Sequence, residues 1–329
     1  MAEKLLSISN LSISYNTYEG KVSAVNGISL DLEQGQTLGL VGESGAGKTT
    51  TALSIMQLVP NPPGRIDAGD IFFEGQNLCK LSERELMKIR GNKISMIFQN
   101  PMTSLNPVAT IGVQITEVLK AHQNLTDADA TKRAAEMLET VQIPAERLRE
   151  YPHEFSGGMR QRVGIAIALA CNPHMIIADE PTTALDVTIQ AQVIDLMREL
   201  REKFGTAMIM ITHDLGIVGE TCDRVAVMYA GEIVEEGSLE QLFTKPLHPY
   251  TVGLFNCIPD IEEDTSNIQP IHGLTPDPLD LPPGCAFHPR CPEAMEICKS
   301  AHPAVREMAP GHRALCHLFD NFGKGGAAR

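Results

Sequence analysis

Eight residues, Gly42-Glu43-Ser44-Gly45-Ala46-Gly47-Lys48-Thr49, constrain this chain more than any other feature. They match the phosphate-binding pattern G-x-x-x-x-G-K-[ST] and lie between an apolar strand pattern at residues 37–41 and an amphipathic helical pattern at residues 50–58. Glycines let successive N–H groups turn toward an anion, and the following helix adds its positive N-terminal end. The pattern predicts a triphosphate site in which Lys48 contacts the outer phosphates and Thr49 ligates Mg²⁺.

Composition limits the remaining possibilities. With 329 residues and 43% hydrophobic side chains, the chain is long enough for one large core with an appendage or for two domains, and we expect two. Its formal charge is −14, which would repel a phosphate backbone, so we expect no nucleic-acid partner.

Hydropathy argues against a membrane-spanning chain. The apolar, uncharged run at residues 163–178 is interrupted by Asn172-Pro173-His174, and the N-terminus lacks the apolar block of a secretory signal. We therefore expect a cytoplasmic protein.

Apolar periodicity predicts an α/β fold. Short strands with turn residues between them, Asn26-Gly27 among these, are expected over residues 5–32 as an antiparallel layer. Residues 113–148 have the pattern of a helical insertion. Strands at residues 70–73, 96–99, 175–178 and 207–211, with a helix at residues 189–204, predict a mainly parallel sheet with crossovers.

A change of composition predicts a domain boundary near Leu239. Beyond residue 237 prolines accumulate, and four of the eight cysteines follow residue 284. We expect a nucleotide-binding domain at residues 1–238, with a helical subdomain at about residues 100–165, and a C-terminal domain at residues 239–329 containing the cysteine cluster.

A second candidate element is the acidic end of the strand at residues 175–178. Asp179 is predicted to ligate Mg²⁺, which needs few protein ligands because it keeps several waters. Glu180 is the candidate for polarising the attacking water.

Residues 155–162, Phe-Ser-Gly-Gly-Met-Arg-Gln-Arg, resemble the signature motif of ATP-binding cassette (ABC) ATPases, and the order of phosphate loop, signature and acidic pair is that of this family. The resemblance covers roughly residues 5–237. It implies that Gln99 is the Q-loop glutamine, which also approaches Mg²⁺, and that His213 is the switch histidine. It also implies that Asp186 belongs to the D-loop and that Tyr15 stacks on adenine. As alternatives, Tyr15 could be an ordinary strand aromatic, His213 a buried structural histidine and Gln99 a turn cap.

The resemblance also implies a head-to-tail pair of ATPase subunits. Ser156, Gly157 and Gly158 open a helix whose start can hold an anion, and in this family each signature closes the nucleotide site of the other subunit. The alternative is that these residues are only a helix cap. The nucleotide-contacting set is then Tyr15, Gly42, Glu43, Ser44, Gly45, Ala46, Gly47, Lys48, Thr49, Thr50, Ser156, Gly157, Gly158 and Asp186.

Residues 97–107, 247–251 and 285–292 resemble the ATPases of dipeptide, oligopeptide and nickel importers. At Met159 the sequence is similar to the D-type subunit of these importers. The D-type subunit pairs with an F-type ATPase beneath two membrane permeases, and an extracytoplasmic solute-binding protein delivers the solute to the permeases. Asn100 departs from the usual aspartate. The resemblance implies ATP hydrolysis coupled to import, more readily of peptides than of nickel, at the cytoplasmic face of the plasma membrane. A soluble ABC ATPase of DNA repair or translation is the alternative, but it would carry long coiled coils or two cassettes.

Cys285, Cys291, Cys298 and Cys316 suggest metal ligation, because a cytoplasmic chain has no steady oxidant to form disulfides. Four thiolates suit Zn²⁺ or a [4Fe-4S] cluster. The spacings are wider than those of zinc knuckles, which favours the cluster, as the peptide-importer resemblance also implies. Four inert buried thiols are the alternative. Cys79, Cys171, Cys222 and Cys257 are scattered and are expected to be structural.

Overall fold

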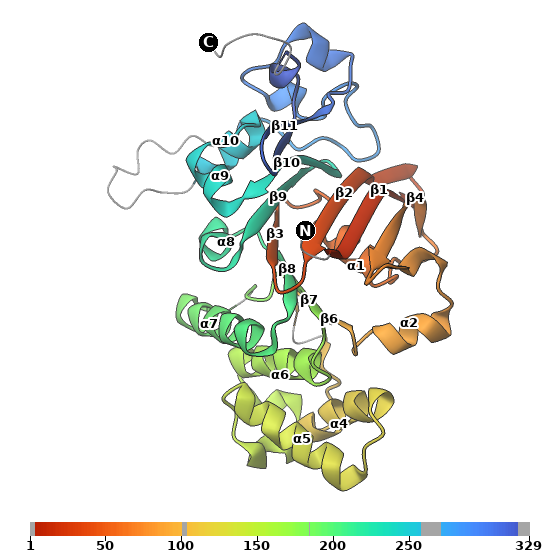
Figure 1. The fold of residues 1–329 in the computed structure, drawn as a ribbon, viewed down its shortest axis with the longest axis vertical. Helices are drawn as coiled ribbons and strands as arrows, with labels where there is room; N and C mark the ends of the chain where they lie inside the picture. The colour runs from red at the N-terminus through yellow and green to blue at the C-terminus, as the bar shows by residue number, and fades with distance from the viewer. Residues whose placement is uncertain (1–3, 101–103, 184, 258–270, 322–329) are drawn as a thin grey trace. The chain divides into compact units, whose positions relative to one another are not determined.

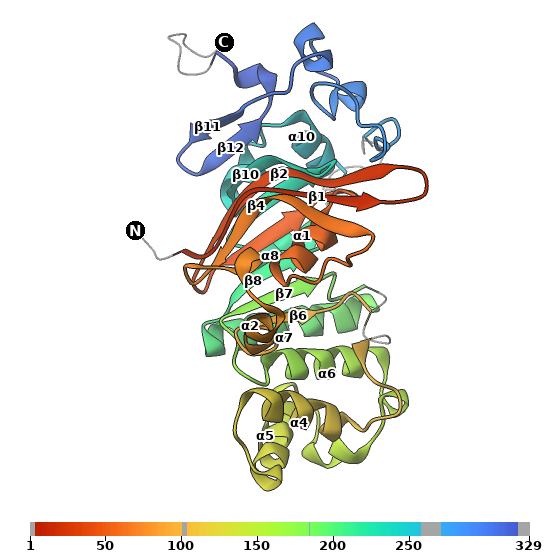
Figure 2. The same ribbon diagram turned by 90° about the vertical axis from the view of Figure 1, so that its right-hand side faces the viewer.

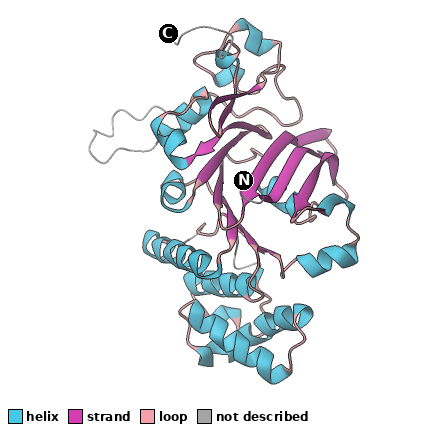
Figure 3. Cartoon of the chain, viewed as in Figure 1, coloured by secondary structure: helices cyan, strands magenta, loops and turns pink. Residues whose placement is uncertain are grey.

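A computed structural model of the chain describes residues 4–100, 104–183, 185–257 and 271–321. The chain folds into two compact units. The first comprises Met1–Leu5, Leu32–Thr37 and Asn77–Ile211, and the second comprises Leu6–Asp31, Leu38–Gln76 and Thr212–Arg329. The chain contains both helices and strands (Figure 3), and the two are interspersed along the sequence, which confirms the expected α/β class.

The first unit contains three parallel strands in the order β8-β7-β6. They are β6 (Ile94–Ile97), β7 (Met175–Asp179) and β8 (Ala207–Ile211). Every residue of β7 and β8 is buried, as is typical of parallel strands covered on both faces. The crossover helices are α6 (Gly157–Leu169) and α7 (Val187–Phe204). This confirms the predicted strands at 175–178 and 207–211, with β7 one residue longer.

The predicted helical insertion is confirmed. It consists of α4 (Ile111–His122) and α5 (Asp127–Thr140), which lie beside α6 in Figures 1 and 2, with the short helix α2 (Glu83–Ile89) before them. Thr110 and Thr126 cap α4 and α5 through their hydroxyl oxygens. Two 3-10 turns, Ala145–Arg149 and Pro152–Glu154, lead to α6.

The second unit begins with an antiparallel sheet in the order β2-β1-β4-β5, of which β2, β1 and β4 are labelled in Figure 2. Its strands are β1 (Lys4–Asn16), β2 (Lys21–Glu33), β4 (Gly64–Phe73) and β5 (Gln76–Asn77). The expected antiparallel layer is therefore confirmed, although two long strands replace several short ones.

The expected turn at Asn26-Gly27 is wrong, because both residues lie inside β2. The Asn26 N–H donates to Gly231 O at 2.8 Å, and its side-chain amide donates to Ala230 O at 2.9 Å. Gly27, at φ +69°, donates its N–H to the Ser12 hydroxyl. Contacts with residues distant in sequence thus keep this dipeptide in a strand, although in isolation it would favour a turn.

A second sheet in this unit runs in the order β11-β12-β10-β9-β3. Strand β3 (Thr37–Val41) is parallel to β9 (Arg224–Tyr229), whereas β10 (Glu232–Ser238), β12 (His312–Leu315) and β11 (Val305–Ala309) add antiparallel strands. The C-terminal strands thus continue the sheet that contains β9. The helices of the unit are α1 (Lys48–Ile55), α8 (Leu215–Thr221), α9 (Leu239–Thr244) and α10 (Pro249–Phe255).

The histidine that caps α10 gives the stability of the fold a specific pH dependence. His248 is buried, its Nδ1 accepts the Tyr250 N–H at 3.1 Å, and its backbone N–H donates to Glu235, whose carboxylate also contacts His312. Burial lowers the pKa of His248 to about 3 from 6.5. Between these values the unfolded chain binds a proton that the native chain excludes, so His248 destabilises the native state as pH falls below about 6.5.

We expect His248→Asn, which keeps a capping oxygen, to lose this contribution. The free energy of unfolding of the wild type should fall more steeply between pH 6.5 and 5, by up to about 1.4 kcal/mol per pH unit relative to the variant. Urea unfolding across this range measures the difference. Parallel pH profiles would contradict the assignment.

Candidate functional site

The loop between β3 and α1 has a backbone that requires glycine. Gly42, Gly45 and Gly47 have φ values of +149°, +82° and +100°. A Cβ on Gly42 would lie 2.2 Å from Met228 O, and one on Gly47 would lie 2.4 Å from Ala24 O. The chain therefore approaches other backbone atoms closely here, and the loop has the conformation of a phosphate cradle.

Lys48 is held across this loop. Its buried ammonium donates to Gly42 O at 2.7 Å and to Glu43 O at 2.9 Å, while Ser44, Gly45 and Thr49 are exposed. The cation thus lies against backbone carbonyls of a loop that is partly exposed to solvent. The residues present fit a Mg²⁺-bound triphosphate, with Lys48 supplying charge and Thr49 an accessible hydroxyl.

The second unit also places Tyr15 beside the loop. The Tyr15 and Thr50 hydroxyls lie 3.4 Å apart, so the expected adenine-stacking aromatic and the start of α1 are neighbours. His213 is exposed directly before α8, which excludes the alternative of a buried structural histidine.

The first unit brings the other predicted catalytic residues together. Asp179 ends β7 and is 3% exposed. Glu180 follows at φ +46°, an uncommon conformation for a residue with a side chain. Its Oε2 accepts the Gln99 amide at 2.8 Å and the Thr183 hydroxyl at 2.9 Å. Gln99 is therefore a partner of Glu180.

The signature residues begin α6. Ser156 is its N-cap, with Oγ accepting the Met159 N–H at 3.4 Å, and both Ser156 and Gly157 are exposed. A Cβ on Gly158 would lie 2.4 Å from Ile189 Cγ2, so this glycine permits close packing of α6 on α7. Asp186 caps α7 by accepting the Ile189 N–H at 3.0 Å. The helix cap observed here leaves the helix start accessible to an anion as well.

Two functional contacts were missed by sequence reasoning. Thr183 supports Glu180, and Arg290 forms an ion pair with Glu43 of the phosphate loop at 2.7 Å. The sequence signal for Arg290 was Glu43, because an acidic side chain inside a phosphate-binding loop requires a positively charged partner. Residues 101–103 and Ala184, which belong to motifs used above, lie outside the described residues.

The four C-terminal cysteines are free thiols near one another. The Cys285 N–H donates to Cys298 O at 2.9 Å. Burial, with smaller contributions from the other cysteines, raises the pKa values of Cys285 and Cys316 to about 11. Among the residues that the structure describes, however, no three Cys, His, Asp or Glu side chains are arranged to hold a metal ion. The expected iron–sulfur cluster therefore stays a prediction.

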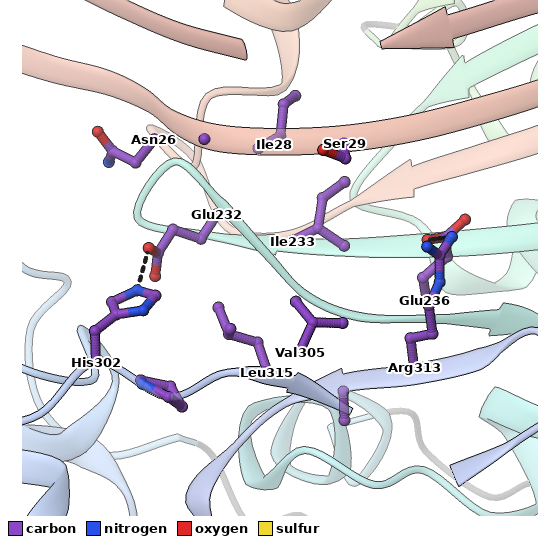
Figure 4. A pocket seen from close by; sticks show the side chains of 13 residues that line it. Asn26, Ile28, Ser29, Glu232, Ile233, Glu236, His302, Val305, Arg313 and Leu315 are labelled. Carbon is purple, nitrogen blue, oxygen red and sulfur yellow. Dashed lines mark hydrogen bonds and ion pairs between the residues drawn. The ribbon is translucent and has the colours of Figure 1, made fainter. Parts of the chain in front are cut away.

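A pocket of about 260 Å³ lies elsewhere in the second unit, between β2, β10 and residues 302–315 (Figure 4). Its acidic groups already have partners: Glu232 contacts His302 at 2.6 Å, and Glu236 contacts Arg313 at 2.6 Å. None of the predicted nucleotide or metal residues lines it.

Comparison with known families agrees with this geometry. Residues 25–183 match the family described as ABC transporter, and residues 234–298 match the oligopeptide/dipeptide transporter C-terminal region. In the part of the chain that the structure describes, no helix combines the length and apolar character needed to cross a bilayer.

Similar proteins cover nearly the whole chain. The oligopeptide transport ATP-binding protein AppD of Bacillus subtilis is 51% identical over 97% of this chain and 98% of its own. The oligopeptide transport ATP-binding protein OppD of Escherichia coli is 50% identical over 96% of this chain and 93% of its own. A solved dimer of the ATP-binding cassette MJ0796 bound to ADP and Pi is 29% identical, covers 71% of this chain and 98% of its own, and has a TM-score of 0.64. The two family matches and the similarity over nearly the full length show that the chain belongs to the ATP-binding proteins of the ABC transporter family, in the branch of the oligopeptide and dipeptide transporters.

Proposed function

We propose that this chain is the ATP-hydrolysing subunit of an importer of oligopeptides or dipeptides, working at the cytoplasmic face of the plasma membrane. The observation that carries the proposal is the glycine cradle around Lys48 in a chain similar over nearly its full length to peptide transport ATP-binding proteins. The names of those relatives supply the cargo class.

Different site residues have different roles in ATP hydrolysis. The N–H groups of residues 44–50 and the Lys48 ammonium bind the phosphates, and the Tyr15 ring supports the adenine. Thr49, Asp179 and Gln99 would hold Mg²⁺, which neutralises charge on the β- and γ-phosphates. Glu180 orients the attacking water and takes its proton, and His213 contacts the γ-phosphate.

We further propose that the nucleotide site is completed in trans. The exposed start of α6, at Ser156 and Gly157, and the D-loop Asp186 would approach the γ-phosphate held by a second ATPase of the F type. Two permeases would dock on the first unit, where Phe98 and Val113 are each 45% exposed. A solute-binding protein would act indirectly, outside the membrane.

Peptide uptake tests the function. The solute-binding protein must reach the outer face of the complex, which is enclosed in inside-out vesicles. Right-side-out proteoliposomes that contain the full complex and internal ATP are therefore appropriate. We expect accumulation of a labelled dipeptide or oligopeptide that stops with Lys48→Met, because the variant loses the phosphate-binding cation. Uptake of Ni²⁺ instead of peptide would overturn the cargo assignment, and equal uptake with Lys48→Met would overturn the function.

For the C-terminal part we propose a domain at residues 239–329, attached to the cassette of residues 1–238, that holds a [4Fe-4S] cluster through Cys285, Cys291, Cys298 and Cys316. Two observations support the proposal: four thiolates are the usual ligands of such a cluster, and the backbone bond between Cys285 and Cys298 brings two of the loops together. A bound Zn²⁺ is the alternative occupant.

Anaerobic purification tests the cluster. We expect a brown protein that absorbs near ~400 nm and contains about four irons per chain. Cys316→Ser should lose both the colour and the iron, because it removes one ligand. Cys222→Ser, at a buried thiol outside this group, should keep both. Stoichiometric zinc, or no metal in the wild type, would contradict the cluster.

A further inference from the structure

Arg290 has a partner for every N–H of its guanidinium. Its Nε donates to His272 O at 3.2 Å. One terminal nitrogen donates to Glu43 Oε2 at 2.7 Å and to the Tyr229 hydroxyl at 3.3 Å, and the other donates to Glu43 Oε1 at 3.0 Å and to Ile271 O at 3.4 Å. The five donors of an arginine are thus all used, and no lysine could reproduce this geometry.

This contact joins the C-terminal region to the phosphate loop. The Arg290 side chain is 6% exposed, and Glu43, the second residue of the loop, is 27% exposed. The backbone of Glu43 is fixed as well, because its N–H donates to the Tyr250 hydroxyl at 2.9 Å. The loop conformation is therefore fixed by Tyr250 and Arg290, which lie 207 and 247 positions away in sequence.

An aromatic cluster holds the guanidinium in place. Tyr229 lies 5.1 Å from Phe287 and 4.6 Å from Tyr250 between ring centroids, and all three rings are buried. The Arg290 guanidinium lies 5.8 Å from the Tyr229 ring centroid. Since this cluster restricts the guanidinium, little side-chain freedom is lost when it pairs with Glu43.

The ion pair between Arg290 and Glu43 also changes the net charge at the phosphate loop. A carboxylate in a loop that binds a polyanion repels the ligand unless a cation neutralises it. The Lys48 ammonium is directed at backbone oxygens, because it donates to the Gly42 and Glu43 carbonyls at 2.7 and 2.9 Å. Arg290 instead pairs with both carboxylate oxygens of Glu43.

We propose that Arg290 is a positioning residue for ATP: it neutralises Glu43 and fixes the phosphate loop, so that nucleotide affinity depends on the C-terminal region. The inference rests on ATP binding at this loop, as proposed above, and adds a role for residues beyond the cassette. Loss of Arg290 would leave an unpaired negative charge in the loop.

Calorimetric titration of the full chain with Mg-ATP tests the proposal. Arg290→Met should weaken binding about tenfold, corresponding to about 1.4 kcal/mol. Arg290→Lys should recover part of the loss, because it restores charge without the bidentate geometry. The double variant Glu43→Gln/Arg290→Met should bind ATP more tightly than Arg290→Met alone, since the unpaired carboxylate is gone.

The matched control is Arg313→Met. Arg313 comes from the same C-terminal region and pairs with a buried carboxylate, Glu236, at 2.6 Å, but it lies in the pocket of Figure 4 and not at the phosphate loop. It should lower thermal stability without changing ATP affinity. Wild-type affinity in Arg290→Met, or no gain in the double variant, would overturn the inference. A wild-type chain that binds no ATP would instead contradict the proposed function, and the inference with it.

Discussion

Replacing Glu180 by Gln is expected to lower the rate of ATP hydrolysis at least about 100-fold while leaving ATP binding unchanged, because a general base typically contributes about 10²–10⁴-fold. The variant should keep the local structure. The side-chain oxygen of Gln can still accept the Gln99 amide and the Thr183 hydroxyl, which now bond to Glu180 at 2.8 and 2.9 Å. What it loses is the carboxylate that we propose takes a proton from water.

Phosphate release by the complete complex, with partner ATPase and permeases present, measures this effect. Glu202→Gln provides a control, because Glu202 is an exposed acid of α7 in the same unit. Binding of ATP is followed separately by calorimetry. Undiminished hydrolysis in Glu180→Gln would rule out the assignment of Glu180.

Replacing Gly157 by Asp is expected to abolish hydrolysis of the nucleotide that the partner subunit holds. Gly157 is exposed at the start of α6, and among the described residues a Cβ there would meet only Leu185, at an ordinary 3.7 Å, so the fold should tolerate the change. The new carboxylate would face the partner's γ-phosphate. Like charges about 4 Å apart repel by about 4 kcal/mol at an effective dielectric constant near ~20, so the loss should be at least about 100-fold.

The matched control is Gly164→Asp, a residue about two turns further along α6 with open space around its Cβ. It adds the same charge to the same helix away from its N-terminus, and hydrolysis should stay near the wild-type rate. ATP binding by the variant chain's own loop should be unaffected in both. Equal activity of Gly157→Asp and Gly164→Asp would show that the signature has no role in trans.

Local patterns were enough to predict most of the fold and the position of the phosphate loop. The fully buried strands β7 and β8 are continuous apolar runs in the sequence, and the phosphate loop has a spacing that few other structures require. The pairing of Gln99 with Glu180 agrees with the strand order, since both residues follow neighbouring parallel strands, whose carboxyl ends meet at one edge of a sheet.

Local patterns could not predict contacts between segments that are distant in sequence. Asn26-Gly27 has the composition of a turn, yet bonds to Ala230 and Gly231 keep it in a strand. Arg290 lies 247 residues from Glu43, and no periodicity links the two. Each outcome depends on tertiary partners, which override local preference where they satisfy backbone groups or buried charges.

We propose that ATP is held between the phosphate loop of one ATPase and the signature turn of another. The decisive experiment is a cryo-electron microscopy structure of the complete complex carrying Glu180→Gln, with Mg-ATP bound. We expect triphosphate density beside Lys48 of this chain and beside the phosphate loop of its partner, with Ser156 and Gly157 against the partner's γ-phosphate. Triphosphate bound away from Lys48, or ATPase subunits that never meet through this turn, would contradict it.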